Sequence, residues 1–85
     1  MSEIHKYIRT GEGFILWPAH WACTHREVAR ATAIYRGQMP PISAGFVSFD
    51  APGVPTCGGM SESMGLSSKP EDSMLLAVQM GSPKP

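Results

Sequence analysis

The stretch ISAGFVSFD, residues 42–50, is the cleanest β-strand pattern in the chain, and the interpretation of the rest starts from it. Phe46, Val47 and Phe49 belong to the residue types that are enriched in strands. The next residues, APGVP (51–55), favour a turn because proline and glycine supply turn conformations. We therefore expect the run TCGGMSESM (56–64) to return as the antiparallel partner of 42–50.

The run 56–64 combines small and polar residues in an alternating pattern. A strand has a period of two, so Cys57, Gly59, Ser61 and Ser63 share one side, although the sequence leaves open which side is buried. The adjacent Gly58 and Gly59 weaken the strand and predict a bulge, or the close approach of another backbone or of a ligand.

The N-terminal part contains a second hairpin signal, KYIRTGEGFILWP (6–18). Two apolar or β-branched runs flank Gly11, Glu12 and Gly13, whose glycines accept the positive φ of a tight turn. We predict strands at about 4–10 and 13–17. Pro18 should end the second strand because it lacks a backbone donor.

Two helices are predicted from their capping patterns. Thr24 with Glu27 has the spacing of a reciprocal N-terminal cap, which predicts a helix near 25–35 that ends at Gly37. Ser68 with Glu71 repeats that spacing before a second helix, which ends at Gly81. The apolar stripe expected on the second helix consists of Met74, Leu75 and Val78.

The predicted order is β-β-α-β-β-α. This order is typical of an α+β fold in which a small antiparallel sheet of about four strands carries two helices packed on one face. We expect one domain over residues 1–81 and a flexible tail at 82–85, where SPKP contains two prolines.

Composition limits the classes of function. Seven Lys and Arg balance seven Asp and Glu, so no basic footprint for duplex nucleic acid is expected. No apolar run reaches the ~20 residues of a membrane span, and residues 1–10 lack the apolar core of a signal peptide, so we expect a cytoplasmic protein. At 85 residues the core is small, which favours a homo-oligomer.

The hexapeptide HWACTH, residues 20–25, invites two chemical hypotheses. The first is a zinc site built from His20, Cys23 and His25 with the distant Cys57, although Cys57 has no second ligand nearby. The second is nucleophilic catalysis by either cysteine with a histidine base, because a thiol before a helix start gains from the helix dipole. Both cysteines are expected to be free thiols in a reducing compartment, with a Cys23–Cys57 disulfide as the alternative.

A third hypothesis is an anion-binding pocket made by the helix starts, whose free amides bind phosphate or carboxylate oxygens. Trp21 can stack on a base, and the facing strand supplies hydroxyl groups. Taken singly, each of these residues fits an ordinary core or surface role better than a ligand contact. The predicted ligand-binding residues are Trp21, His25, Arg26, Gly59, Ser61, Ser63, Ser68 and Lys69, with no catalytic or metal-binding residue and no cofactor.

The segments SAGFVSF and CGGMSESMGLSSKPEDSMLLA resemble small, mostly uncharacterised proteins of tailed bacteriophages and prophages. These proteins share the pattern S-A-G-F, a short turn, G-x-S-x-S-(L/M), then S-x-P-E-D and a terminal helix. The resemblance covers about residues 43–78. It implies a phage accessory protein of the host cytoplasm that acts as a binder, for example a sponge that sequesters nucleotide signals of host defence.

Three functions follow from this reading. The first is a non-enzymatic, homo-oligomeric anti-defence protein that captures a phosphorylated small molecule, such as a nucleotide immune signal. The second is a protein inhibitor that blocks a host enzyme through exposed Met60, Met64 and Trp21. The third is a zinc-stabilised structural domain.

Overall fold

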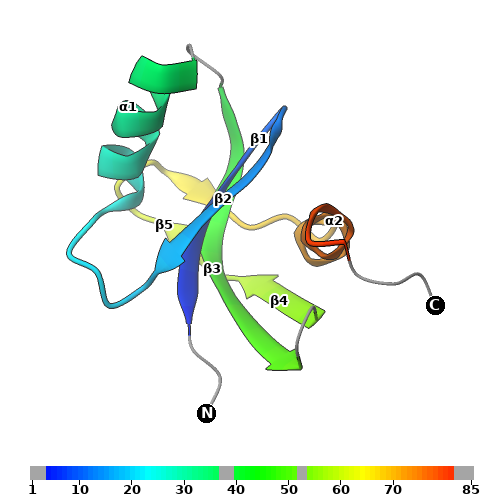
Figure 1. Cartoon of the computed structure of the whole chain (residues 1–85). Helices are drawn as coiled ribbons and strands as arrows, with labels where there is room; N and C mark the ends of the chain where they lie inside the picture. The colour runs from blue at the N-terminus through cyan, green and yellow to red at the C-terminus, as the bar shows by residue number, and fades with distance from the viewer. Residues whose placement is uncertain (1–3, 37–39, 52–53, 82–85) are drawn as a thin grey trace.

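The computed structural model describes residues 4–36, 40–51 and 54–81 and has an α+β fold (Figure 1). A four-stranded antiparallel sheet has the strand order β2-β1-β3-β4, and a separate two-stranded ribbon pairs β5 with β6. The elements are β1 (His5–Thr10), β2 (Gly13–Pro18), α1 (His25–Arg36), β3 (Pro41–Ala51), β4 (Val54–Gly58), β5 (Met60–Ser61), β6 (Leu66–Ser67) and α2 (Asp72–Gln79).

The first predicted hairpin is confirmed, and the second is confirmed only as far as Gly58, with β4 already beginning at Val54 inside the predicted turn. Strands β1 and β2 pair with Tyr7 opposite Leu16, and β3 pairs with β4 so that Val47 lies opposite Cys57. The central contact joins β1 to β3, with Tyr7 opposite Gly45. The bounds of β1 and β2 agree closely with the predicted 4–10 and 13–17, and β2 ends at Pro18.

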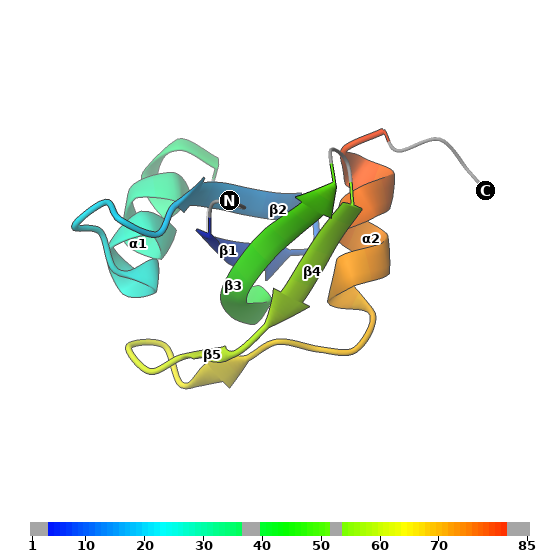
Figure 2. The same cartoon turned by 90° about the horizontal axis from the view of Figure 1, so that it is seen from below.

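The two helices pack on opposite faces of the sheet, so the prediction that both lie on one face is wrong (Figures 1 and 2). Neighbouring residues of a strand point to opposite sides, and here Tyr7 and Ile8 are both buried. Tyr7 packs with Leu76 of α2, whereas Ile8 belongs to the cluster that holds Val28 of α1. We call these two surfaces the Tyr7 face and the Ile8 face.

The predicted strand 56–64 is interrupted at Gly59, which corrects the expected simple order of elements. Gly59 has a φ of 77° and separates β4 from the β5–β6 ribbon. Met64 and Leu66 from this ribbon pack in the Ile8 cluster. The chain thus turns away from the sheet and folds beneath the Ile8 face, and the predicted bulge near the glycine pair takes the form of this break.

The predicted capping of α1 is confirmed atom by atom. The Glu27 N–H donates to Thr24 Oγ1 at 3.1 Å, and the Thr24 N–H donates to Glu27 Oε1 at 2.9 Å. These bonds satisfy two amides at the helix start, and the helix follows from His25. The predicted stop at Gly37 lies outside the described residues.

The predicted cap of α2 is wrong. The helix begins at Asp72, and its N-cap residue Glu71 makes no side-chain capping bond. Instead the Asp72 carboxylate accepts the Lys69 N–H at 2.9 Å. Asp72, and not Ser68, makes the side-chain bond before this helix, and its carboxylate is held in place by burial against β1.

The predicted apolar stripe of α2 is also wrong in two of its three members. Met74 and Val78 are 65% and 67% exposed, whereas Leu76 is buried and Leu75 is half-buried. The helix therefore presents Asp72, Leu75 and Leu76, at spacings of three and four, to the Tyr7 face.

The end of α2 is tied to the edge of the sheet at β2. The Phe14 N–H donates to Gln79 Oε1 at 2.6 Å, and Gln79 Nε2 donates to the Phe14 carbonyl at 3.1 Å. A side chain thus pairs with an edge strand in place of another backbone. The predicted tail, 82–85, lies outside the described residues. Among the residues described, no helix has the length and apolar character that crossing a membrane requires.

Candidate functional site

A cleft of about 430 Å³ opens between the start of α1 and the β5 segment, on the Ile8 face of the sheet. It brings together three of the eight predicted ligand-binding residues, His25, Ser61 and Ser63. We call it the anion cleft. Its lining residues are Lys6, Thr24, His25, Phe46, Met60, Ser61, Glu62 and Ser63.

His25 forms the buried wall of the anion cleft. The side chain is 4% exposed, and its Nε2 lies 2.8 Å from the Gly45 carbonyl, so Nε2 carries the proton in this bond. The ring makes edge contacts with Trp17 and Phe46, with centroids 5.3 and 5.7 Å away. Burial lowers the pKa of His25. The hydrogen bond to the Gly45 carbonyl raises it in part, and the nearby positive charge of Lys6 lowers it further. A neutral imidazole is therefore the favoured form at neutral pH.

The two serines enter the anion cleft because the chain breaks at Gly59. Ser61 is 1% exposed, whereas Ser63 is exposed, and their hydroxyl oxygens are 3.3 Å apart. The hydroxyl that accepts in this bond keeps its own proton for a ligand, and both oxygens can still accept. The pair therefore offers adjacent hydroxyl groups from a short segment that faces the helix start.

The anion cleft is lined by both a positive and a negative side chain, Lys6 and Glu62. Lys6 Nζ donates to the Cys23 carbonyl at 3.0 Å, which holds the ammonium group beside the start of α1. Trp17 Nε1 donates to the same carbonyl at 3.3 Å. Glu62 adds an exposed carboxylate on the β5 side. An anion would therefore bind nearer to Lys6 and the helix start, where the positive end of the helix also lies.

The other five predicted residues are distributed elsewhere. Trp21 and Arg26 are exposed, and neither is among the described residues that line the anion cleft. The Ser68 N–H donates to the Gly59 carbonyl at 3.0 Å, which fixes both residues at the base of the β5–β6 ribbon. The Lys69 N–H is occupied by Asp72. The structure therefore does not bring Ser68 and Lys69 into the anion cleft, and the Asp72 carboxylate occupies the Lys69 amide at the start of α2.

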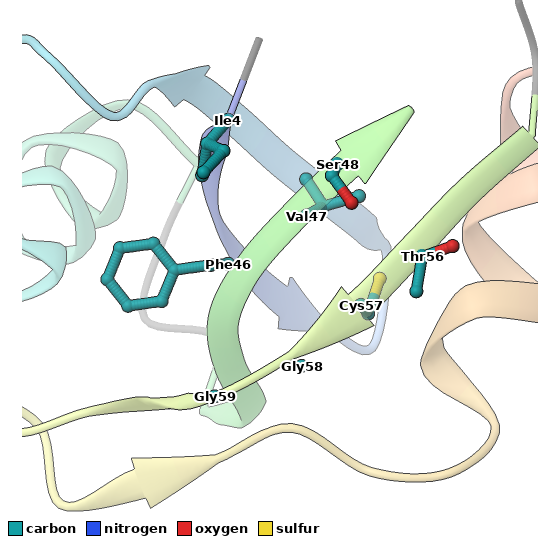
Figure 3. A pocket seen from close by; sticks show the side chains of 8 residues that line it. All are labelled: Ile4, Phe46, Val47, Ser48, Thr56, Cys57, Gly58 and Gly59. Carbon is teal, nitrogen blue, oxygen red and sulfur yellow. The ribbon is translucent and has the colours of Figure 1, made fainter. Parts of the chain in front are cut away.

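A second cleft, of about 270 Å³, lies next to the first and contains Gly59 (Figure 3). It is lined mainly by apolar groups and by the glycine backbone, and Phe46 borders both clefts. We call it the Phe46 cleft. Its lining residues are Ile4, Phe46, Val47, Ser48, Thr56, Cys57, Gly58 and Gly59.

Sequence reasoning missed Lys6 and Phe46, which the register of the sheet brings together. These residues are direct partners across β1 and β3, so both side chains leave the sheet on the Ile8 face. A signal was present in the alternation of 4–10, which assigns Lys6 to the same side as Ile8. What the sequence did not provide is the pairing of β1 with β3 across the intervening helix.

The structure separates the two cysteines of the zinc hypothesis. Cys57 packs in the Tyr7 cluster and Cys23 in the Ile8 cluster, so the two free cysteines lie on opposite faces of the sheet. Within the described part of the chain, no three His, Cys, Asp or Glu side chains gather where they could hold a metal ion. Burial raises the pKa of the Cys57 thiol, which disfavours the reactive thiolate.

A second cluster of ionisable groups lies on the Tyr7 face, away from both clefts. Asp72 is fully buried and accepts hydrogen bonds from Tyr7 Oη at 2.5 Å and from Arg9 Nη1 at 3.1 Å. Arg9 Nη1 also contacts Glu71 Oε2 at 3.1 Å. Burial raises the pKa of Tyr7, and the neighbouring Asp72 carboxylate raises it further. This cluster joins α2 to β1 and is part of the framework of the fold.

Comparisons with protein-family models, with curated proteins and with solved structures yield no match for this chain.

Proposed function

We propose that this protein binds a phosphorylated small molecule of the nucleotide class in the anion cleft and retains it without chemical conversion. The observation that carries the proposal is the convergence of His25, Ser61 and Ser63 on one cleft, beside Lys6 and the start of α1. Lys6, His25 and the serine pair come from three separate parts of the chain. Their meeting is what a preformed polar binding site requires.

Each of these groups can contribute to binding a phosphate. Lys6 supplies a positive charge, and its ammonium has three donors, of which one is engaged with the Cys23 carbonyl. The hydroxyl groups of Ser61 and Ser63 share one hydrogen bond, which leaves the pair one further neutral donor for a phosphate oxygen. The first amides of α1 add the positive end of the helix, which favours an anion within its first turn.

A binding role without chemistry is supported by the state of two groups that could act as base or nucleophile, His25 Nε2 and the Cys57 thiol. The His25 Nε2–H is committed to the Gly45 carbonyl, so this nitrogen cannot accept a proton from a substrate. The raised pKa of Cys57 keeps its sulfur protonated and weakly nucleophilic. We therefore propose a sequestering protein.

The biological setting that we propose follows from the resemblance of residues 43–78 to small proteins of tailed bacteriophages. In that setting the protein is an anti-defence accessory protein in the host cytoplasm. Its ligand is a nucleotide immune signal, and its small core is completed by homo-oligomerisation.

Thermal unfolding in the presence of nucleotides tests this proposal. A ligand present at about 100 times its dissociation constant adds about 2.7 kcal/mol to the free energy of unfolding, which raises Tm by several degrees. We expect at least one cyclic or linear nucleotide to raise Tm by this amount. The protein should also sediment as an oligomer.

Two matched serine variants locate the binding site. Ser63→Ala removes an exposed hydroxyl of the anion cleft and should weaken binding about tenfold, as expected for one lost hydrogen bond. Ser67→Ala removes another exposed hydroxyl, from β6 and outside the described lining of the cleft, and should leave affinity unchanged. Equal effects of the two changes, or no Tm shift with any nucleotide, would refute the proposal.

A second candidate function is inhibition of a host protein, and the exposed apolar side chains favour it. Met60 and Trp21 are 51% and 54% exposed, whereas Met64 is half-buried in the Ile8 cluster and so drops out of the predicted patch. Met74 and Val78, four residues apart on α2, add a second apolar surface. Recovery of one stoichiometric host protein on the immobilised protein, with no nucleotide shift, would select this function.

A further inference from the structure

We propose that the Phe46 cleft is the subsite for the planar base of the same ligand, so that the protein selects a nucleotide and not a bare phosphate or sugar phosphate. The inference rests on the proposed function of the anion cleft and adds the part of the ligand that sets specificity. It follows from how the two clefts are joined.

The two clefts are neighbours on one surface. Lys6, Phe46 and Gly58 are consecutive partners across β1, β3 and β4. Phe46 is 38% exposed and lines both clefts, with Lys6 in one and Gly58 in the other. A ligand that occupies both clefts would therefore pass directly over the Phe46 ring.

The chemistry of the two clefts differs as the two ends of a nucleotide differ. The anion cleft holds Lys6, hydroxyl groups and the helix start, whereas the Phe46 cleft is bordered by the side chains of Ile4 and Phe46 and by glycine backbone. Ile4 is 53% exposed, so its apolar surface is accessible to a ligand in this cleft. The flat ring of a nucleobase covers apolar and aromatic side chains well, and any of the bases can stack on phenylalanine.

The position of the Phe46 ring is fixed by the residues around it. The His25 ring meets it edge-on, with an interplanar angle of 85°. A Cβ at Gly59 would lie 3.1 Å from Phe46 Cδ2, so the glycine leaves room for the ring where another residue would crowd it. In Figure 3 the ring projects from β3 with Ile4 on one side and the Gly58–Gly59 strand on the other. The site is thus preformed for stacking.

Gly58 allows this inference to be tested without disturbing the fold. A Cβ built at Gly58 meets no atom within 4 Å, and its φ lies outside the left-handed region. Gly58→Val therefore places bulk in the Phe46 cleft, and valine is a residue type that strands favour. Ala31→Leu, on the exposed surface of α1, is the control for added apolar bulk elsewhere.

The probes are the nucleoside 5′-monophosphates, ribose 5-phosphate and inorganic phosphate, titrated by calorimetry into the full-length protein. For wild type we expect at least one nucleoside monophosphate to bind tenfold or more tightly than ribose 5-phosphate. Gly58→Val should abolish that difference and leave ribose 5-phosphate binding unchanged. Ala31→Leu should behave as wild type.

The possible failures are distinguishable. Equal affinity for nucleoside monophosphate and ribose 5-phosphate, or an advantage that survives Gly58→Val, overturns the base subsite while the proposed function stands. Absence of binding by every probe overturns the base subsite, and it overturns the proposed function as well if no cyclic or linear nucleotide raises Tm. A wild-type dimer that Gly58→Val converts to a monomer in sedimentation, with unchanged affinity for the probes, assigns the Phe46 cleft to a second copy of the chain and also overturns the inference.

Discussion

The Tyr7 hydroxyl donates to the Asp72 carboxylate at 2.5 Å, although the two residues are 65 positions apart in the chain. Both side chains are fully buried, at the point where α2 meets the first strand. Asp72 also accepts from Arg9 Nη1 and from the Lys69 N–H. A buried carboxylate with three donors is well satisfied, and loss of its charge or its geometry leaves those donors unpaired.

Asp72→Asn should therefore lower the free energy of unfolding by about 3 kcal/mol, because breaking a buried ion pair leaves its partner uncompensated. Chemical denaturation of both proteins measures this. Glu71→Gln is the matched control, since Glu71 contacts the same Arg9 Nη1 but its side chain is 45% exposed, and stability should be unchanged. Equal losses in the two variants would show that the attraction to Arg9, and not burial, is what matters.

Acid should destabilise the fold through the same residue. Burial alone raises the pKa of Asp72, but the bonds from Tyr7, Lys69 and Arg9 outweigh it, so the pKa lies below the ordinary value of 3.8. The unfolded chain then takes up this proton first. The contribution of Asp72 is present above pH 3.8 and is lost as the pH falls through its lowered pKa. The unfolding free energy of Asp72→Asn measured across this range should lack that loss.

His25 predicts a second pH dependence at milder acidity. Burial lowers its pKa in the folded protein below the ordinary 6.5, with Lys6 adding to the effect. The unfolded chain binds the proton first, so the contribution of His25 is complete above pH 6.5 and declines as the pH falls through its lowered pKa. His25→Gln should remove this decline. Titration of the His25 ring resonances by NMR gives the pKa directly, and a value at or above 6.5 would contradict the buried neutral ring.

Two glycines on paired strands should respond in opposite ways to alanine. A Cβ at Gly45 would lie 2.5 Å from the Gly58 carbonyl oxygen, so Gly45→Ala forces the backbone apart and should cost about 2 kcal/mol. Gly58→Ala meets open space and should leave the free energy of unfolding unchanged or slightly raised. Thermal and urea unfolding of both variants measures the difference. A stable Gly45→Ala protein would mean that β3 and β4 are less close than described.

The cap of α1 should account for a measurable share of stability. Thr24→Ala removes the acceptor of the Glu27 N–H and should lower the free energy of unfolding by about 1 kcal/mol. Ser67→Ala, an exposed hydroxyl outside any described helix start, is the control and should be neutral. Circular dichroism with urea denaturation compares them. If Thr24→Ala proved as stable as the control, water would satisfy the amide as well as Thr24 does.

The candidate site was only partly accessible to sequence reasoning. His25, Ser61 and Ser63 were predicted correctly as neighbours because a helix start and a serine-rich segment are visible locally. Ser68 and Lys69 were placed in the same pocket on the same kind of signal. In the structure, the carboxylate of Asp72 occupies the start of α2, and its partners lie far away in the chain. Lys6 and Phe46 entered the site only through the pairing of β1 with β3.

The sequence by itself determined the two β-hairpins and the first helix. Their signals are local: turn residues lie between the paired strands, and Thr24 and Glu27 complete the cap within three positions. Only the tertiary structure decided which face of α2 is buried, that the helices lie on opposite faces, and that the chain after Gly58 leaves the sheet to pack on the Ile8 face. Those features depend on the hydrogen bond between Tyr7 and Asp72, which are 65 positions apart, and on the packing of Met64 and Leu66 of the β5–β6 ribbon against the Ile8 face. Such contacts form between segments whose separate patterns carry no information about each other.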